Sequence, residues 1–191
     1  MLGRKEPVSV LLQAQANVYH EKKEGWNSML IAAAAGRSMI TGFCLEVQAD
    51  VNRVNSKGYV PLHMAASYGY PQVVLLLLQY KADKDVMSPA GTALSLASER
   101  GHLKVIQMLL QANATVDLTR QEDGKTAMHC AAGRNQVHAV QLLLDAAADI
   151  DRPCAEGFTP IHVAATRCCV ETCRLLQLQR PAARKVAKGS R

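Results

Sequence analysis

The sequence predicts an all-α protein in which helical hairpins stack side by side as a solenoid, with short turns or β-hairpins at their tips. A seven-residue motif recurs five times, and the third residues of its copies lie 33, 32, 34 and 33 positions apart. An alanine before a polar turn keeps nearly the same period. Two independent markers with one period indicate a repeat array. The motif residues are Met29, Leu62, Leu94, Met128 and Ile161, and the turn alanines are Ala16, Ala49, Ala82, Ala114 and Ala148.

The composition favours helices in a protein that lies outside membranes. Of 191 residues, 49% are hydrophobic and 20% are charged, which excludes disorder of the whole chain. Only eight residues are aromatic, whereas sandwiches and barrels draw on aromatic and β-branched residues. The longest strictly aliphatic stretch is residues 73–78, far shorter than the roughly 18 residues of a membrane span. With no secretory signal pattern, we expect reduced cysteines and a cytoplasmic location, with the nucleus as the second choice.

Each unit reads as turn, helix, turn, helix. In the second unit, apolar residues at three-to-four spacing form two bursts, around Leu62 and Val73, which Gly69 and Tyr70 separate. Threonines at N-cap positions and prolines in first turns mark where helices begin. These residues are Thr92, Thr126, Thr159, Pro61, Pro71 and Pro160.

The repeat boundaries divide the chain into three parts. Residues 1–24 correspond to an N-terminal half repeat and a turn, because residues 8–16 match a second helix without a first. Residues 25–180 form the array, whose five units begin near positions 25, 57, 89, 123 and 156. Residues 181–191 form a basic tail for which we expect disorder. Gly42 falls inside the second helix of the first unit, so we expect this unit to be the least stable.

The motif Gly-x-Thr-Pro-Leu-His-x-Ala-Ala, followed by Gly-His-Leu-x-Val-Ile and by Leu-Leu with Ala-Asp, resembles the ankyrin-repeat family over about residues 7–180. The match is weaker in the first unit, where Leu30 stands at the histidine position. The resemblance implies a solenoid that binds another protein along its concave face, without catalysis, as an adaptor, scaffold or inhibitor. It implies no cofactor and no small-molecule substrate, and we expect a monomer.

The resemblance also implies which positions face the partner, namely the turn tips and the exposed ends of the first helices. Carried over to this sequence, these 25 positions hold four of the eight aromatic residues. Aromatic residues dominate interface hot spots, so we expect the main anchor at Trp26, Tyr59 and Tyr68. The alternative is that an aromatic residue at a turn tip packs on the neighbouring turn. The predicted partner-binding residues are Trp26, Lys57, Tyr59, Tyr68, Glu99, Arg100, Lys125, Arg134, Phe158 and Arg167.

Most of the net charge of +6 lies at the C-terminal end. Residues 180–191 carry five basic side chains and no acidic one, which leaves +1 for the other 179 residues. The predicted concave positions mix six basic with five acidic residues, whereas a nucleic-acid footprint has one sign. We therefore expect any contact with nucleic acid to involve the tail alone. The alternative function is a regulatory protein that uses its tail for nuclear targeting or for binding nucleic acid or an anionic surface.

Three histidines recur at one repeat position, His63, His129 and His162. Because a catalytic base is unique rather than periodic, we expect these side chains to bond the backbone of the neighbouring repeat. The sequence contains no phosphate-binding loop, nucleophile elbow or dinucleotide fingerprint. We predict no catalytic residue and no cofactor.

The cysteines near the C-terminal end invite a zinc-site interpretation, because Cys169 and Cys173 lie four residues apart close to Cys168 and His162. The spacing differs from that of a Cys-x-x-Cys knuckle. Cys168 replaces the glycine between two helices, and three other cysteine positions hold Leu, Met, Val or Ile in sister units. These three are Cys44, Cys130 and Cys173. Buried cysteine behaves as a small hydrophobe, so we expect packing roles and no metal.

Overall fold

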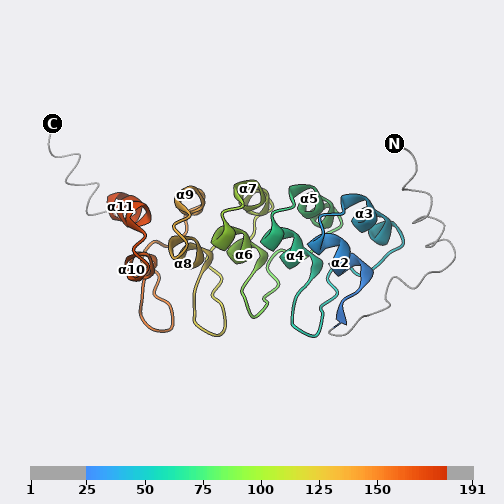
Figure 1. Ribbon diagram of the computed structural model, residues 1–191, viewed down its shortest axis with the longest axis horizontal. Coiled ribbons are helices and arrows are strands. Elements are labelled where there is room, and N and C mark those ends of the chain that lie inside the picture. Colours follow the sequence, from blue (N-terminus) through green and yellow to red (C-terminus); the bar gives the residue numbers. More distant parts are fainter. Residues whose placement is uncertain (1–24, 180–191) are drawn as a thin grey trace.

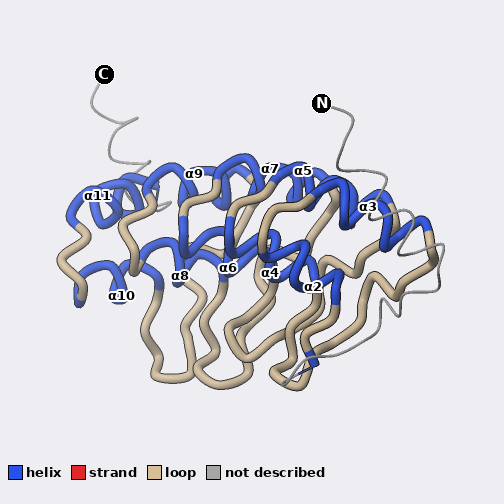
Figure 2. The backbone as a smooth tube through the Cα atoms, turned by 45° about the vertical axis from the view of Figure 1, so that its right-hand side comes forward, coloured by secondary structure: helices blue, strands red, loops and turns tan. Residues whose placement is uncertain are grey.

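The computed structural model describes residues 25–179, which form five helical hairpins stacked in one row (Figure 1). The first helices of the hairpins lie in one layer and the second helices in another, while the turns between hairpins project from the first layer (Figure 2). The first helices are α2 (Ser28–Ala34), α4 (Pro61–Tyr68), α6 (Ala93–Arg100), α8 (Ala127–Ala132) and α10 (Pro160–Thr166). The second helices are α3 (Ser38–Glu46), α5 (Pro71–Gln79), α7 (Leu103–Gln111), α9 (Val137–Asp145) and α11 (Val170–Gln179).

This architecture confirms the predicted all-α solenoid. Within residues 25–179 the hairpin tips are turns rather than β-hairpins, and an isolated antiparallel bridge joins Ser88 to Gly91. The predicted half repeat in residues 1–24 and the basic tail in residues 181–191 lie outside the described residues. Within residues 25–179, every helix is too short or too polar to cross a lipid bilayer.

The core runs along the whole row between the two layers. Each repeat contributes aliphatic side chains from both of its helices, and those from neighbouring repeats merge into one buried cluster. In the middle of the row, Leu62, Leu94 and Met128 are each 1% exposed. A single hairpin has no such cluster of its own, so each repeat depends on its neighbours for burial.

Capping side chains fix where the first helices begin. The Asn27 carboxamide oxygen accepts a hydrogen bond from the Leu30 N–H at 2.9 Å, and the Thr92 hydroxyl accepts one from the Ser95 N–H at 3.2 Å. Thr126 and Thr159 occupy the predicted N-cap positions. There the histidine three residues on completes a capping box by accepting the N–H of the cap residue.

The recurring histidines connect one repeat to the next. Nδ1 of His63 accepts the Val60 N–H at 3.1 Å, while Nε2 donates to the Val86 carbonyl in the following turn at 2.9 Å. His129 repeats this arrangement, and its Nε2 lies 3.0 Å from the Phe158 carbonyl oxygen. The predicted contact with the neighbouring backbone is therefore confirmed for these two histidines. Burial lowers the pKa of His63 to about 4, so the ring is neutral at physiological pH.

A glycine in a left-handed conformation ends the first helix where the next repeat covers it. Gly69 has φ 72°, and an added Cβ would collide with the His102 ring, whose Nε2 is bonded to the Ser67 carbonyl at 3.0 Å. Cys168 takes the equivalent place in the last described repeat with φ 55°, as the sequence predicts, and its side chain is exposed. Glycine at position 69 thus leaves room for the His102 ring, which packs on this turn from the next repeat.

Candidate functional site

Two adjoining hollows open on the surface formed by the turn tips and the ends of the first helices. We call this surface the groove face. The first hollow, of about 610 Å³, lies between α4 and α6, and we call it the aromatic hollow. The second, of about 60 Å³, lies between α6, α8 and α10, and we call it the basic pocket. Glu99 and Arg134 line both, so the two hollows share a border.

Tyrosine and aliphatic side chains form the aromatic hollow. Tyr68 is 50% exposed and stacks on Tyr70, with 6.3 Å between the ring centres. The Arg100 guanidinium lies 5.6 Å from the centre of the Tyr68 ring, within the range of a cation–π interaction. Met64 and Leu96 are almost fully buried beneath this rim. The hollow therefore combines an apolar floor with an exposed aromatic ring and a cation.

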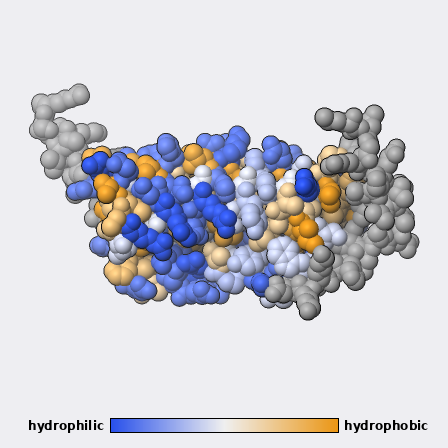
Figure 3. Space-filling model, in the orientation of Figure 1, coloured by the Kyte–Doolittle hydropathy of each residue, from blue (hydrophilic) through white to orange (hydrophobic). Residues whose placement is uncertain are grey.

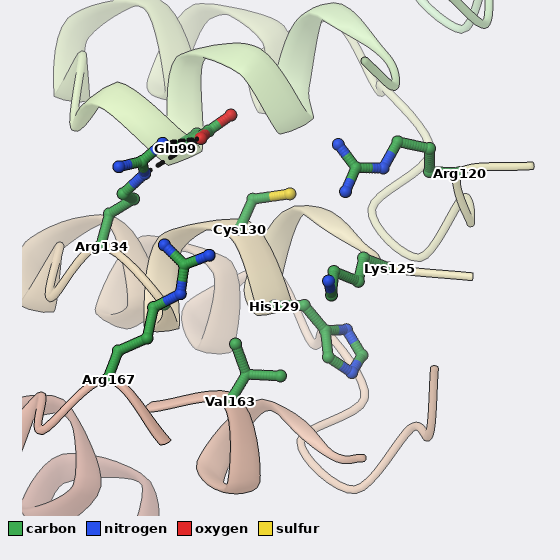
Figure 4. Close-up of a pocket in the computed structure, with 9 residues that line it drawn as sticks. Glu99, Arg120, Lys125, His129, Cys130, Arg134, Val163 and Arg167 are labelled. Carbon is green, nitrogen blue, oxygen red and sulfur yellow. Dashed lines mark hydrogen bonds and ion pairs between the residues drawn. The ribbon is translucent and has the colours of Figure 1, made fainter. Parts of the chain in front are cut away.

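Charged side chains from three repeats form the basic pocket (Figure 4). Arg120 pairs with Asp123 in the turn before α8, and the Lys125 ammonium lies 3.0 Å from the same carboxylate. Arg134 donates two hydrogen bonds to one oxygen of Glu99, at 2.8 and 3.0 Å. Arg167 forms no ion pair with any residue in the part of the chain that the structure describes.

The pocket carries an excess of positive charge. Its four cations, Arg120, Lys125, Arg134 and Arg167, face two carboxylates, Glu99 and Asp123, which leaves a net charge of +2. In Figure 4, Arg134 and Arg167 approach Cys130 from one side and Arg120 and Lys125 from the other. The Cys130 thiol adds no negative charge, because burial raises its pKa to about 11.

Hydrogen bonding fixes the charge states in the turn before α8. The Arg120 guanidinium holds the pKa of the Asp123 carboxyl well below its usual range, and the same bond raises the pKa of Arg120. His129, which also lines the pocket, is 1% exposed, and burial lowers its pKa. Its two ring nitrogens are engaged in the cap and in the bond to the next turn. His129 thus positions the turn and is not available as a base.

Surface character changes along the row. Figure 3 shows hydrophilic side chains gathered over α6 and α8, and paler or apolar ones towards α4 and α2. The two hollows follow this division, because the aromatic hollow lies at α4 and α6 and the basic pocket at α6, α8 and α10.

The structure brings seven of the ten predicted partner-binding residues to these two hollows. Tyr59, Tyr68 and Arg100 line the aromatic hollow, Lys125 and Arg167 line the basic pocket, and Glu99 and Arg134 line both. Tyr59 is half-buried and also makes an edge contact with the ring of His63, with 5.9 Å between centres. Their role in binding stays a prediction.

The other three predicted residues lie apart from both hollows. Trp26 is half-buried and packs against the hydrophobic core. Phe158 is 41% exposed and contacts the His162 ring of its own repeat at 6.3 Å. Lys57 is exposed at a turn tip. The sequence reasoning overlooked Arg120, although its three-residue spacing from Asp123 is the one available signal of their pairing.

The cysteines give no sign of a metal centre in the described part of the chain. All six are free thiols, and Cys169 is buried whereas Cys168 is exposed. Among residues 25–179, no three His, Cys, Asp or Glu side chains lie close enough together to hold a metal ion.

Comparison with known proteins identifies the repeat. A family model described as ankyrin repeats, in three copies, matches residues 1–88 and 94–187. The matched residues make up most of the chain, in agreement with the resemblance noted in the motif. A search of curated proteins gave no match.

Proposed function

The chain belongs to the ankyrin-repeat family, whose repeats are typically protein–protein interaction modules, and we propose that it is a non-catalytic adaptor, scaffold or inhibitor. It binds a partner protein along the concave side of the array, which corresponds to the groove face.

The aromatic hollow is the observation that carries this proposal. Tyr68 and Arg100 are exposed there, beside the half-buried Tyr59, above the apolar floor formed by Met64 and Leu96. Tyrosine and arginine are the residue types that contribute most to protein interfaces, especially when they surround an apolar pocket. The core does not need these exposed side chains, because aliphatic residues fill the space between the helix layers. A partner side chain that fills the hollow would cover Met64 and Leu96 and would bury the cation–π pair of Arg100 and Tyr68.

The basic pocket supports a binding role over a catalytic one. Small-molecule sites enclose about 300–1,000 Å³, whereas this pocket encloses about 60 Å³. Both ring nitrogens of His129 in the pocket wall are engaged by backbone groups. The Cys130 thiol is neutral, because burial raises its pKa. The side chains of the pocket are therefore suited to binding a charged group rather than to catalysis.

A partner-capture experiment tests the proposal. Three purified proteins serve as bait: the wild type, a groove-face variant with Tyr68→Ala and Arg100→Ala, and a control with Tyr80→Ala and Lys104→Ala. The control removes an exposed tyrosine and an exposed cation from the second-helix layer. We expect proteins that the wild type and the control retain at matched concentration and that the groove-face variant loses. Equal thermal unfolding of the three baits shows that the difference lies at the surface.

Two outcomes would contradict the proposal. Either both variants lose the captured proteins equally, or the groove-face variant retains them. A further variant that lacks residues 181–191 separates the alternative function of the tail, whose four basic residues favour anionic targets. If the tail alone carries the function, this deletion abolishes capture, whereas a groove-binding protein keeps its partner.

A further inference from the structure

We propose that the basic pocket binds the carboxylate of an aspartate or glutamate side chain on the partner, while the aromatic hollow holds an apolar residue of the same segment. The inference rests on the proposed function and specifies its partner as an acidic, apolar-anchored protein segment. It follows from the charge and size of the basic pocket and from the border that it shares with the aromatic hollow.

The charge argument begins with Arg167. Its guanidinium lines the basic pocket and pairs with no carboxylate among residues 25–179. Glu99 and Asp123 are already engaged by Arg134, Arg120 and Lys125. The uncompensated charge of the pocket is therefore positive, and an arginine fork matches a carboxylate in two parallel hydrogen bonds.

The packing of the fifth repeat on the fourth brings this cation to the pocket. Arg167 follows α10 directly, and its Cδ lies 3.5 Å from the position that a Cβ of Gly133 would take. Cγ1 of Val163, one turn earlier, lies 3.0 Å from the same position. Because Gly133 has no side chain, the fifth repeat packs closely enough to bring Arg167 beside the ion pairs of the third and fourth repeats.

The size of the pocket selects a single small group. One buried water needs about 10–15 Å³ of such volume, so the pocket of about 60 Å³ has room for about four waters. A carboxylate fits this space, and a drug-sized ligand does not. The carboxylate must therefore project from a larger molecule that stays outside the pocket.

The border that the two hollows share points to a protein segment. The aromatic hollow shares Glu99 and Arg134 with the pocket and has about ten times its volume, with an apolar floor. A protein segment with an apolar side chain beside an acidic one can occupy both hollows at once. A nucleic-acid strand fits less well, because the predicted concave positions mix five acidic with six basic residues, whereas a nucleic-acid footprint has one sign.

Selection from a random peptide library provides the probe. Peptides are selected on the wild-type protein, and the tightest binder is synthesised twice, once as selected and once with its Asp and Glu residues changed to Asn and Gln. Both peptides are titrated calorimetrically into the wild type, Arg167→Gln and Lys104→Gln. Lys104 is an exposed cation on α7, outside both hollows, and serves as the matched control.

The proposal expects coupling between the peptide carboxylate and Arg167. The amide peptide binds the wild type about tenfold more weakly than the acidic peptide, but the two peptides differ little on Arg167→Gln. Lys104→Gln behaves as the wild type. Raising the salt concentration weakens the acidic peptide more than the amide peptide.

Three results would overturn the inference. They are equal affinity of the two peptides for the wild type, equal effects of Arg167→Gln and Lys104→Gln, and saturation of the pocket by inorganic phosphate alone, which would reveal a free-anion site. Binding of the selected peptides to the variant with Tyr68→Ala and Arg100→Ala keeps the two proposals distinct. If selected peptides need Tyr68 and Arg100 but no carboxylate, the inference fails and the proposed function stands. If they need neither, both fail.

Discussion

The second and fifth repeats begin with the same local structure, but among the described residues only the second has a further repeat packed on its C-terminal side. In both, Nδ1 of the histidine accepts the N–H of the cap residue, at 3.1 Å for His63 and 3.2 Å for His162. His63 is 1% exposed and also reaches the turn of the next repeat, whereas His162 is exposed and makes no such bond to described residues. Local signals thus form the hairpin, and the neighbouring repeat converts a helix cap into a connection between repeats.

The same difference appears at two other positions. Leu62 is 1% exposed, but the equivalent Ile161 is only half-buried. Gly69 is covered by His102, while Cys168 has an exposed side chain in the same left-handed conformation. Stability in this array therefore comes largely from contacts between repeats, as expected for a solenoid.

Replacing the connecting histidine gives the largest expected effect. In His63→Ala, the Val60 N–H and the Val86 carbonyl lose their partner in a buried place, which lowers the free energy of unfolding by about 3 kcal/mol. In His162→Ala, the exposed site costs less than about 1 kcal/mol, because water replaces the lost bond. Urea unfolding of both variants measures the contrast. Equal losses would show that the cap alone, and not the contact between repeats, sets the contribution of the histidine.

Acid should weaken the middle of the array through the same histidine. The pKa of His63 is about 4 in the folded protein and 6.5 as a free side chain, so the unfolded chain takes up the proton first. The stabilisation is complete above pH 6.5 and is lost as the pH falls towards 4, by about 2 kcal/mol at pH 5. Asp123 contributes little between pH 6.5 and pH 5, because an aspartate of the unfolded chain takes up its proton only near pH 3.8.

The control for this pH dependence is His63→Gln, which keeps an oxygen that can accept the cap N–H but does not titrate. Urea unfolding at pH 7 and pH 5 should show a smaller loss in this variant than in the wild type. The same loss in both proteins would assign the pH dependence to other groups.

Substitutions in the turn between the two helices of a hairpin test the same comparison of the second and fifth repeats through the backbone conformation. Gly69→Ala should lower the free energy of unfolding by about 2 kcal/mol, because the left-handed conformation disfavours a Cβ and the His102 ring must move. Cys168→Gly should stabilise by about 0.5 kcal/mol, as relief of strain exceeds the added flexibility of the unfolded chain. Thermal unfolding of both variants measures the two effects. A neutral Gly69→Ala would mean that the packing of the next repeat tolerates displacement.

The fold could be predicted because every repeat carries its own signals. The apolar motif, the cap threonines and the histidine recur with one period, so a local pattern determined a global architecture. The tips were less predictable, because the resemblance allowed β-hairpins where the described residues form turns.

The candidate site could be predicted only as a set of positions. Counting charges along the sequence gave a mixed surface, since six basic residues faced five acidic ones. The structure pairs Arg134 with Glu99 across 35 positions of sequence and Arg120 with Asp123 within one turn, which leaves the basic pocket positive. Such pairing depends on how neighbouring repeats are stacked, and a period does not specify side-chain conformations.

A smaller effect than those at His63 and Gly69 is expected in the first described repeat. Gly42 lies inside α3 with ordinary helical geometry, and a Cβ added there would meet no atom within 4 Å. Gly42→Ala should therefore raise the free energy of unfolding by up to about 1 kcal/mol, the difference in helix propensity between the two residues. Hydrogen exchange locates the gain, because α3 amides should become better protected while amides of α9, in the fourth repeat, change less. If Gly42→Ala is less stable than the wild type, α3 needs glycine at this position for its contacts. The prediction that Gly42 weakens the first repeat is then wrong.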